Sequence, residues 1–311
     1  MTALVFGGNG QVGSELLRAL AANGKVIATT RSGQLPDGTA CEVADFNEPD
    51  TLSALLDRLQ PSCVVNAAAY TAVDRAEQER ESAQWANAQS PAVIAAWCAA
   101  NTVPLVHYST DYVFDGQGTA PYPEDAPTAP LGVYGETKLA GEQAIRASGA
   151  QHLILRTAWV YASHGTNFLR TMLRVGADRD ELRVVADQVG TPTPAALIAD
   201  VTAQLLQQRT ADTSGTWHLT AAGQTTWHGF AEAIFEEAVA AGLLVRAPRV
   251  VPITTAEYPT PAQRPAYSRL SIDKLQQDFD IVLPEWRVGL QRVIAELVLQ
   301  GTKEAIQPVE D

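Results

Sequence analysis

Ala3-Leu4-Val5-Phe6-Gly7-Gly8-Asn9-Gly10-Gln11-Val12-Gly13 joins an apolar run to a glycine-rich turn near the N-terminus. We expect a buried strand over Ala3–Phe6 and, after the turn, a helix over Val12–Ala22 whose leucines share one side. A strand that leads through glycines directly into a helix is typical of the first unit of a Rossmann-type α/β fold.

The glycines of this turn have the spacing of a phosphate-binding loop. Gly8, Gly10 and Gly13 match G-x-G-x-x-G, and starting from Gly7 gives the variant with two residues between successive glycines. Such glycines let a pyrophosphate approach backbone N–H groups at the positive end of a helix. A plain glycine-rich turn is the alternative, but the strand–turn–helix context favours dinucleotide binding. The residues expected to contact the dinucleotide here are Gly7, Gly10, Gln11, Val12 and Gly13.

Apolar runs and helical patterns alternate through the first half of the chain, which predicts parallel strands joined by crossover helices. The fold class is therefore α/β, a Rossmann-type doubly wound parallel sheet. The further strands are expected at Val26–Thr29, Cys63–Asn66, Leu105–Ser109 and His152–Arg156. The further helices are expected at Thr51–Leu59, Asp74–Asn87, Pro91–Ala100 and Gly135–Ala147.

The alternation weakens after Arg156, and this divides the chain into two parts. Residues 1–156 are predicted to form the NADP(H)-binding Rossmann domain. Residues 157–300 are predicted to form a smaller C-terminal substrate-binding lobe, interleaved with the last elements of the sheet. The proline-rich segment Pro248–Pro265 is expected to be irregular, and residues 301–311 form a polar tail.

Composition narrows the function classes. The 311 residues are 46% hydrophobic, which is ample for a large core, and the formal charge is −13. This acidic balance argues against nucleic acid or an anionic membrane as the main partner. No apolar run reaches the roughly 20 residues that span a bilayer, and no secretory leader follows Met1, so we expect a cytoplasmic protein.

The end of the second strand bears on cofactor choice. An NAD-selective site usually has an Asp or Glu there for the ribose hydroxyls. This chain has Thr30, Arg31 and Ser32 instead, a cation with two hydroxyls that suits a 2′-phosphate. We therefore predict NADPH, with NADH as the alternative cofactor and a solvated arginine as the alternative explanation of Arg31.

Two later strand ends are expected to complete the cofactor site. Asp45 and Phe46 follow a further, third strand expected between Val26–Thr29 and Cys63–Asn66, where they could meet the adenine ring. Ala67, Ala68 and Ala69 follow the fourth strand, and their small side chains would let the backbone approach the cofactor. Ordinary packing of a helix on the sheet would explain these alanines equally well.

Tyr134 and Lys138 are four residues apart, so they lie on one face of a helix. There the ammonium could lower the pKa of the phenol toward a value useful for proton transfer. Thr110 ends the fifth strand, at the sheet edge where ligands bind, and could orient a substrate oxygen. The trio predicts acid/base chemistry on a carbonyl or alcohol. His107, inside the apolar run, is expected to be a buried structural histidine.

These motifs resemble the extended short-chain dehydrogenase/reductases, whose Ser/Thr, Tyr and Lys match Thr110, Tyr134 and Lys138. More closely, the chain is similar to the dTDP-4-dehydrorhamnose reductase family over nearly its whole length. The stretches that carry this likeness are residues 10–13, 65–74, 109–116, 133–138, 156–161, 190–193 and 264–270.

The resemblance implies that NADPH reduces the C4 keto group of dTDP-6-deoxy-L-lyxo-4-hexulose (dTDP-4-dehydro-β-L-rhamnose). It implies Tyr134 as the proton donor, Lys138 as the residue that lowers its pKa and holds the nicotinamide ribose, and Thr110 as the partner of the carbonyl oxygen. The implied substrate contacts are Asp111 to the sugar, Trp159 to a hexose face, and Arg264 and Arg269 to the diphosphate.

Some members of this family bind Mg²⁺ with carboxylates between two subunits. Glu15 falls on the first of those positions, but the later acidic position lies in Thr193–Leu197, which contains no acid. We therefore expect no metal site, and Glu15 is explained as a solvated helix residue. A homodimer is the base-rate expectation for the oligomeric state.

Two other classes of function compete: another nucleotide-sugar enzyme, either a dehydratase or an epimerase, and a non-catalytic subunit. A nucleotide-sugar 4,6-dehydratase typically has Asp-Glu after the Thr, whereas Tyr112 follows Asp111 here. An epimerase would retain NAD, and Arg31 suits an exchangeable NADPH better. A non-catalytic regulatory subunit on the same fold would be expected to lose part of the trio, and this chain keeps Thr110, Tyr134 and Lys138.

Overall fold

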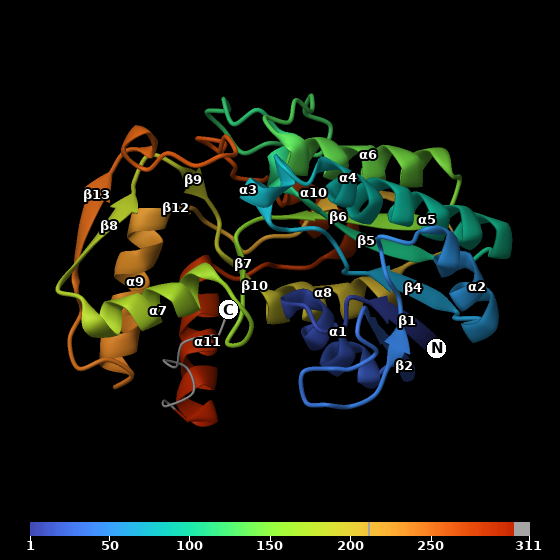
Figure 1. Ribbon diagram of the computed structural model, residues 1–311, viewed down its shortest axis with the longest axis horizontal. Helices are drawn as coiled ribbons and strands as arrows, with labels where there is room; N and C mark the ends of the chain where they lie inside the picture. The colour runs from blue at the N-terminus through green and yellow to red at the C-terminus, as the bar shows by residue number, and fades with distance from the viewer. Residues whose placement is uncertain (211, 302–311) are drawn as a thin grey trace.

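A seven-stranded sheet with strand order β11-β6-β5-β4-β1-β2-β3 forms the centre of the larger lobe. The computed structural model of the chain describes residues 1–210 and 212–301 (Figure 1). Every pairing in this sheet is parallel, so the predicted doubly wound parallel sheet is confirmed. The strands are β1 (Thr2–Phe6), β2 (Lys25–Thr30), β3 (Glu42–Val43), β4 (Cys63–Asn66), β5 (Leu105–Thr110), β6 (His152–Thr157) and β11 (Gly215–His218).

Both faces of the sheet are covered, which explains why its central strands β1 and β4 are buried and mostly apolar. Alternate residues of β1 enter two cores: Ala3 and Val5 face one, and Leu4 and Phe6 face the other. On the first face lie α1 (Gln11–Ala21), α8 (Ala195–Gln208) and α10 (Asp273–Phe279). On the second face lie α2 (Asp50–Leu59), α5 (Ser90–Asn101) and α6 (Val133–Ala147).

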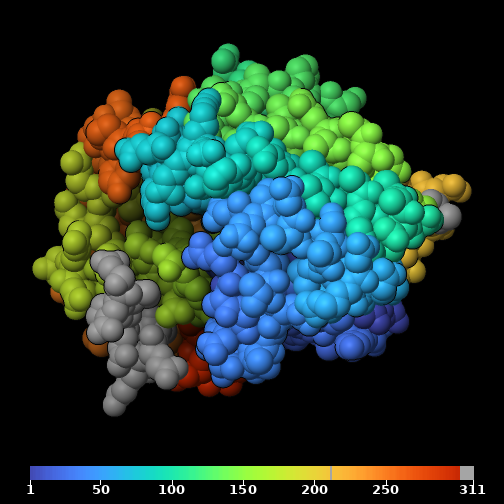
Figure 2. Space-filling view, turned by 45° about the vertical axis from the view of Figure 1, so that its right-hand side comes forward, coloured from blue at the N-terminus to red at the C-terminus, as the bar shows by residue number. Residues whose placement is uncertain are grey.

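A second lobe has its own apolar core and lies beside the sheet (Figure 1). Its elements are α7 (Phe168–Asp178), β8 (Glu181–Val185), α9 (Trp227–Ala240), β13 (Arg249–Ile253) and α11 (Trp286–Gln300). The chain leaves this lobe to place α8 and β11 against the sheet and then returns to it. The space-filling view shows the two lobes side by side, with blue and cyan N-terminal segments next to yellow-green ones (Figure 2).

Several elements differ from the sequence-based expectation. β13 lies in the proline-rich segment expected to be irregular, and Pro252 fits there because β13 has only β8 as a neighbour. The helix expected over Asp74–Asn87 is broken into α3 (Val73–Ala76), α4 (Arg80–Gln84) and the π-helix η1 (Trp85–Gln89).

Short pairs of strands complete the structure near the boundary between the lobes. They are β7 (Val160–Tyr161) with β10 (Thr193–Pro194), and β9 (Val189–Gly190) with β12 (Thr225–Thr226). Two 3₁₀ turns, η2 (Asp111–Val113) and η3 (Thr255–Glu257), also occur. Within residues 1–210 and 212–301, no helix combines the length and hydropathy needed to span a bilayer. From residue 302 onward the predicted polar tail lies outside the described residues.

Candidate active site

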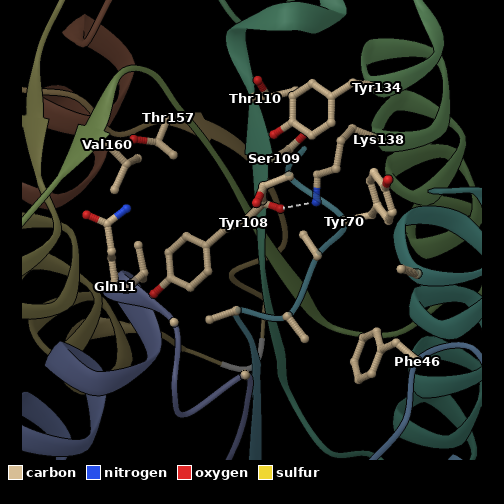
Figure 3. Close-up of a pocket in the computed structure, with 18 of the residues that line it drawn as sticks. Gln11, Phe46, Tyr70, Tyr108, Ser109, Thr110, Tyr134, Lys138, Thr157 and Val160 are labelled. Atoms are coloured by element: carbon tan, nitrogen blue, oxygen red, sulfur yellow. Dashed lines mark hydrogen bonds between the residues drawn. The ribbon is translucent and has the colours of Figure 1, made fainter. Parts of the chain in front are cut away.

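A cavity of about 650 Å³ opens at the carboxyl ends of β1, β4, β5 and β6 (Figure 3). Its walls come from the glycine turn, the segment after β4, the end of β5, the first turn of α6 and residues 157–160. This is the edge at which doubly wound sheets bind ligands. Sequence segments from both lobes therefore meet in one hollow.

The glycine turn has the geometry of a phosphate cradle. Gly7 has a φ of +80°, and a Cβ there would lie 2.8 Å from the Ala68 backbone nitrogen. A Cβ on Gly13 would lie 1.9 Å from the Gly7 carbonyl oxygen, so only glycine allows α1 to start this close to β1. No side chain forms a capping hydrogen bond at Gly10, the residue before α1. The first backbone N–H groups of α1 therefore have no capping partner. This fits the pyrophosphate of a dinucleotide.

At the far end of the cavity, Thr30, Arg31, Asp45 and Phe46 all line the wall, whereas Ser32 does not. The Thr30 hydroxyl is held by the turn that follows, because it accepts from the Gln34 N–H at 3.1 Å. Arg31 is exposed and forms no ion pair within the described part of the chain. Its guanidinium is therefore available to an anionic ligand.

The structure brings Thr110, Tyr134 and Lys138 together at the other end of the cavity (Figure 3). The Tyr134 ring packs edge-on against Tyr112, with ring centroids 5.5 Å apart. Burial raises the pKa of Tyr134 to about 12, against the opposing effect of the Thr110 hydroxyl. The phenol is thus held in its protonated form at neutral pH.

The Lys138 side chain turns toward β5. Its Nζ donates to the Tyr108 carbonyl oxygen at 2.6 Å and lies 3.2 Å from His107 Nε2. Burial lowers the pKa of Lys138 to about 8, with Glu142 opposing. In this structure burial sets the direction of the Tyr134 pKa shift and β5 engages the amine, so a lowering of the pKa of Tyr134 by Lys138 stays a prediction.

Asp111 is a buried acid beside this group. Thr110 Oγ1 donates to its Oδ1 at 3.0 Å, and its Oδ2 has no hydrogen-bond partner among the described residues. Burial raises the pKa of Asp111 to about 6, with the nearby hydroxyls of Ser268 and Thr110 opposing. An orphaned carboxyl oxygen on a cavity wall is suited to accept a hydrogen bond from a ligand hydroxyl.

Trp159 lines the cavity with a strained backbone, at a φ of +49°. Trp227 stacks on its indole at a centroid distance of 3.6 Å, and Gly190 lies against the same ring, where a Cβ would come within 2.4 Å of Cε2. One indole face is thus taken by Trp227, which restricts how Trp159 can meet a ligand.

Two predicted substrate residues lie outside the cavity wall. Arg264 Nη2 pairs with Asp74 Oδ2 at 2.6 Å, and Arg269 Nη1 donates to Gln224 Oε1 at 3.2 Å. Neither arginine lines the cavity. Their side chains are committed to links between segments in this structure.

The cavity is also lined by residues that sequence reasoning did not select. They include Tyr70, Tyr108, Tyr112, Thr157, Val160 and Thr166. Thr157 could have been found, because it ends β6 at the same sheet edge as Thr110. Tyr108 lies two residues before Thr110 on β5 and Val160 lies in β7, whereas Tyr70 and Thr166 lie outside helices and strands and carry no such signal.

Glu15 has protein partners for both carboxylate oxygens. Oε1 lies 3.1 Å from His164 Nε2, and Oε2 accepts from Arg18 Nε at 3.0 Å. Within the described ranges, no group of three or more His, Cys, Asp or Glu side chains is placed to hold a metal ion. Glu15 is thus an ion-paired helix residue in this structure.

Comparisons with known proteins agree with this geometry. The family described as RmlD substrate binding domain matches residues 1–299. The chain is 48% identical over 301 residues to the dTDP-4-dehydrorhamnose reductase of Escherichia coli K12, covering 96% of this chain and 98% of that one. Two solved dTDP-4-dehydrorhamnose reductases share the fold. The one from Clostridium acetobutylicum is 36% identical, with a TM-score of 0.86 and coverage of 96% and 100%. The one from Bacillus anthracis, in complex with NADP, is 31% identical, with a TM-score of 0.85 and coverage of 95% and 99%.

Proposed function

We propose a function from one premise: this chain belongs to the family described as RmlD substrate binding domain and is an oxidoreductase. We infer that it reduces the C4 keto group of dTDP-4-dehydro-β-L-rhamnose with NADPH, giving dTDP-L-rhamnose. One observation carries this proposal. A single cavity joins the glycine cradle and the unpaired Arg31 at one end to Thr110, Tyr134 and Lys138 at the other.

The cofactor end fits NADPH. The unpaired N–H groups at the start of α1 would bind the pyrophosphate, and Arg31 would bind the 2′-phosphate. Asp45 and Phe46 would border the adenine. NADPH, when bound, supplies the hydride for the reduction.

The catalytic end fits a proton donor to a developing alkoxide. A reduction needs a protonated phenol, and the raised pKa of Tyr134 keeps it protonated. The Thr110 hydroxyl, which donates to Asp111 in this structure, would turn to donate to the keto oxygen, and Lys138 would hold the nicotinamide ribose. Contacts of this kind are typically worth roughly 10²–10⁴-fold in rate each.

The sugar would lie between Asp111 and Trp159. The orphaned Asp111 oxygen would accept from a sugar hydroxyl, and the part of the indole that Trp227 leaves open would contact the ring. Arg264 Nη2 is paired with Asp74, but its Nη1 has no hydrogen-bond partner among the described residues, so a diphosphate role for Arg264 would use Nη1 or replace Asp74 at Nη2.

The test is an absorbance assay of NADPH consumption with the keto sugar made in situ. We expect consumption by the wild type, a loss of roughly 10²–10⁴-fold in Tyr134→Phe, and little change in Tyr258→Phe. Tyr258 is a matched control because its side chain is exposed. No consumption by the wild type, or full activity in Tyr134→Phe, would overturn the proposal.

Cofactor choice is tested separately. Arg31→Asp is expected to shift the preference from NADPH toward NADH, whereas Arg246→Asp, on the surface of the other lobe, should leave the ratio unchanged. An unchanged ratio in Arg31→Asp would show that Arg31 does not read the 2′-phosphate.

A further inference from the structure

Asn66, His107 and Lys138 form a buried series that runs from β4 through β5 to α6. Asn66 Nδ2 lies 3.1 Å from His107 Nδ1, and His107 Nε2 lies 3.2 Å from Lys138 Nζ. The three residues are 1%, 0% and 2% exposed, so water does not compete for these contacts. The proton positions along the series therefore follow from which groups can donate and which can accept.

The backbone fixes the first proton. The Ala68 N–H donates to Asn66 Oδ1 at 3.1 Å. A backbone N–H can only donate, so the amide oxygen must face Ala68 and the amide NH₂ must face His107. His107 Nδ1 consequently accepts, and the single proton of the neutral ring sits on Nε2. An imidazolium would place two donors against each other at Nδ1.

The second contact then determines what Lys138 can be. His107 Nε2–H points at Nζ, and Nζ donates to the Tyr108 carbonyl oxygen at 2.6 Å. An ammonium has three donors and no lone pair, so it cannot accept from Nε2–H. An amine can accept from His107 and donate to Tyr108 at once. We propose that Asn66 and His107 are positioning residues that favour the uncharged amine form of Lys138.

The other groups around Lys138 leave room for this effect. Burial already lowers the pKa of Lys138. Glu142, one turn along α6, acts in the other direction and raises this pKa. Glu142 is itself bound by Arg156, through Nε at 2.8 Å and Nη2 at 2.7 Å, so its charge is largely compensated. The titratable and charged groups near Lys138 are His107 and Tyr108 from β5, Asp111 and Tyr112 from η2, Tyr134 and Glu142 from α6, and Arg156 from β6.

The kinetic consequence rests on the proposed function. In the fraction of molecules in which Lys138 is an ammonium, a proton can pass from it to the phenolate once Tyr134 has given its proton to the alkoxide, and the amine later regains a proton from water. His107 stabilises the amine left after this transfer. The tautomer and the charge form of Lys138 do not depend on the substrate and can be measured on the full chain alone.

The first experiment is ¹⁵N NMR of histidine-labelled wild-type protein near pH 7, with the His107 signals assigned by loss in His107→Gln. We expect an unprotonated Nδ1 and a protonated Nε2. A ring protonated at Nδ1, or at both nitrogens, overturns the proposal. This measurement needs only the wild type to be folded once the signals are assigned.

The second experiment follows the pKa of Lys138 by ¹³C-lysine NMR, where Lys25, Lys138, Lys274 and Lys303 are the only four lysines. In Asn66→Asp, one carboxylate oxygen can accept from Ala68 and the other from His107 Nδ1–H, which moves the lone pair to Nε2. The ring then accepts from the ammonium, and the pKa of Lys138 rises.

Asn66→Asp changes two things at once: it moves the His107 proton to Nδ1 and it adds a negative charge near Lys138. A double-mutant cycle separates these two effects, because Asn66→Asp in a His107→Leu background adds the charge but has no imidazole ring. We expect the pKa of Lys138 to rise by at least about one unit more when His107 is present, a tenfold change in the amine fraction. Equal rises in both backgrounds would overturn the proposal. Correct NMR results with no keto-sugar reduction would instead refute the proposed function alone.

Discussion

Glu142→Gln is expected to destabilise the protein far more than a change at any exposed acid of the same helix. The Glu142 side chain is 0% exposed and accepts two hydrogen bonds from Arg156, whose side chain is 3% exposed. Glutamine keeps the shape but turns one acceptor into a donor that faces the guanidinium. The substitution also removes the negative charge that compensates the buried Arg156 guanidinium.

The size of the loss follows from burial. Removing one partner of a buried ion pair typically costs about 3–5 kcal/mol. The matched control is Glu136→Gln on the same helix, because Glu136 pairs with Arg80 at 2.7 Å while both side chains are about half exposed, at 49% and 59%. Exposed pairs contribute about 1 kcal/mol or less.

The assay is urea denaturation followed by two independent probes, with the free energy of unfolding extrapolated to water. Burial alone would raise the pKa of Glu142, but Arg156 brings it below its ordinary value. The pair therefore stabilises fully above the unfolded pKa of about 4.3, and its contribution is lost as pH falls through the lower folded pKa. A loss within about 1 kcal/mol of the Glu136→Gln value, or a difference from wild type that does not shrink in acid, would refute this reasoning.

Three further perturbations test other parts of the structure. The folded pKa of Asp111 is raised to about 6. Wild-type stability should therefore fall as the pH rises from the lower, unfolded pKa of this carboxyl to its folded pKa. Asp111→Asn should then be more stable than wild type above pH 6, by at most about 3 kcal/mol, and a gap in thermal midpoint that persists at pH 4 would contradict this. Gly190→Ala should push the Trp159 indole and cost about 1–3 kcal/mol, and an unchanged near-UV circular dichroism spectrum would count against it. Asp74→Ala should speed hydrogen exchange at Ala262, whose N–H donates to Asp74 Oδ1 at 3.2 Å, with a stability change under about 1 kcal/mol; unaltered exchange there would show that the link is not what orders this segment.

The larger lobe could be predicted from sequence because its signals are local. The central strands are short, mostly apolar runs, the crossover helices bury an apolar face, and the Gly7–Gly13 turn needs glycine for reasons visible in a few residues. The resemblance stretches lie mostly at these strand ends, so they also identified the family correctly.

The smaller lobe was harder because its signals are not local. β8 pairs with β13, which follows it only after α8, β11 and α9, so neither sequence segment indicates its partner. Pro252 made β13 resemble irregular chain. Side-chain commitments were also invisible: a helical spacing cannot show that Lys138 turns to β5, or that Arg264 is paired with Asp74.

The return of α8 and β11 to the sheet has a consequence for synthesis. A ribosome releases the chain from its N-terminus, so β6 emerges long before β11, the strand that covers its outer edge. Until β11 has been synthesised, β6 is an edge strand with no partner on its outer side. Until α8 has been synthesised, the face of α1 that packs against it is exposed to solvent. We therefore expect a fragment that stops at residue 156 to aggregate rather than fold. The two lobes have separate cores, but the core of the larger lobe is complete only after α8, β11 and α10, which follow α7 and β8 of the smaller lobe in the chain.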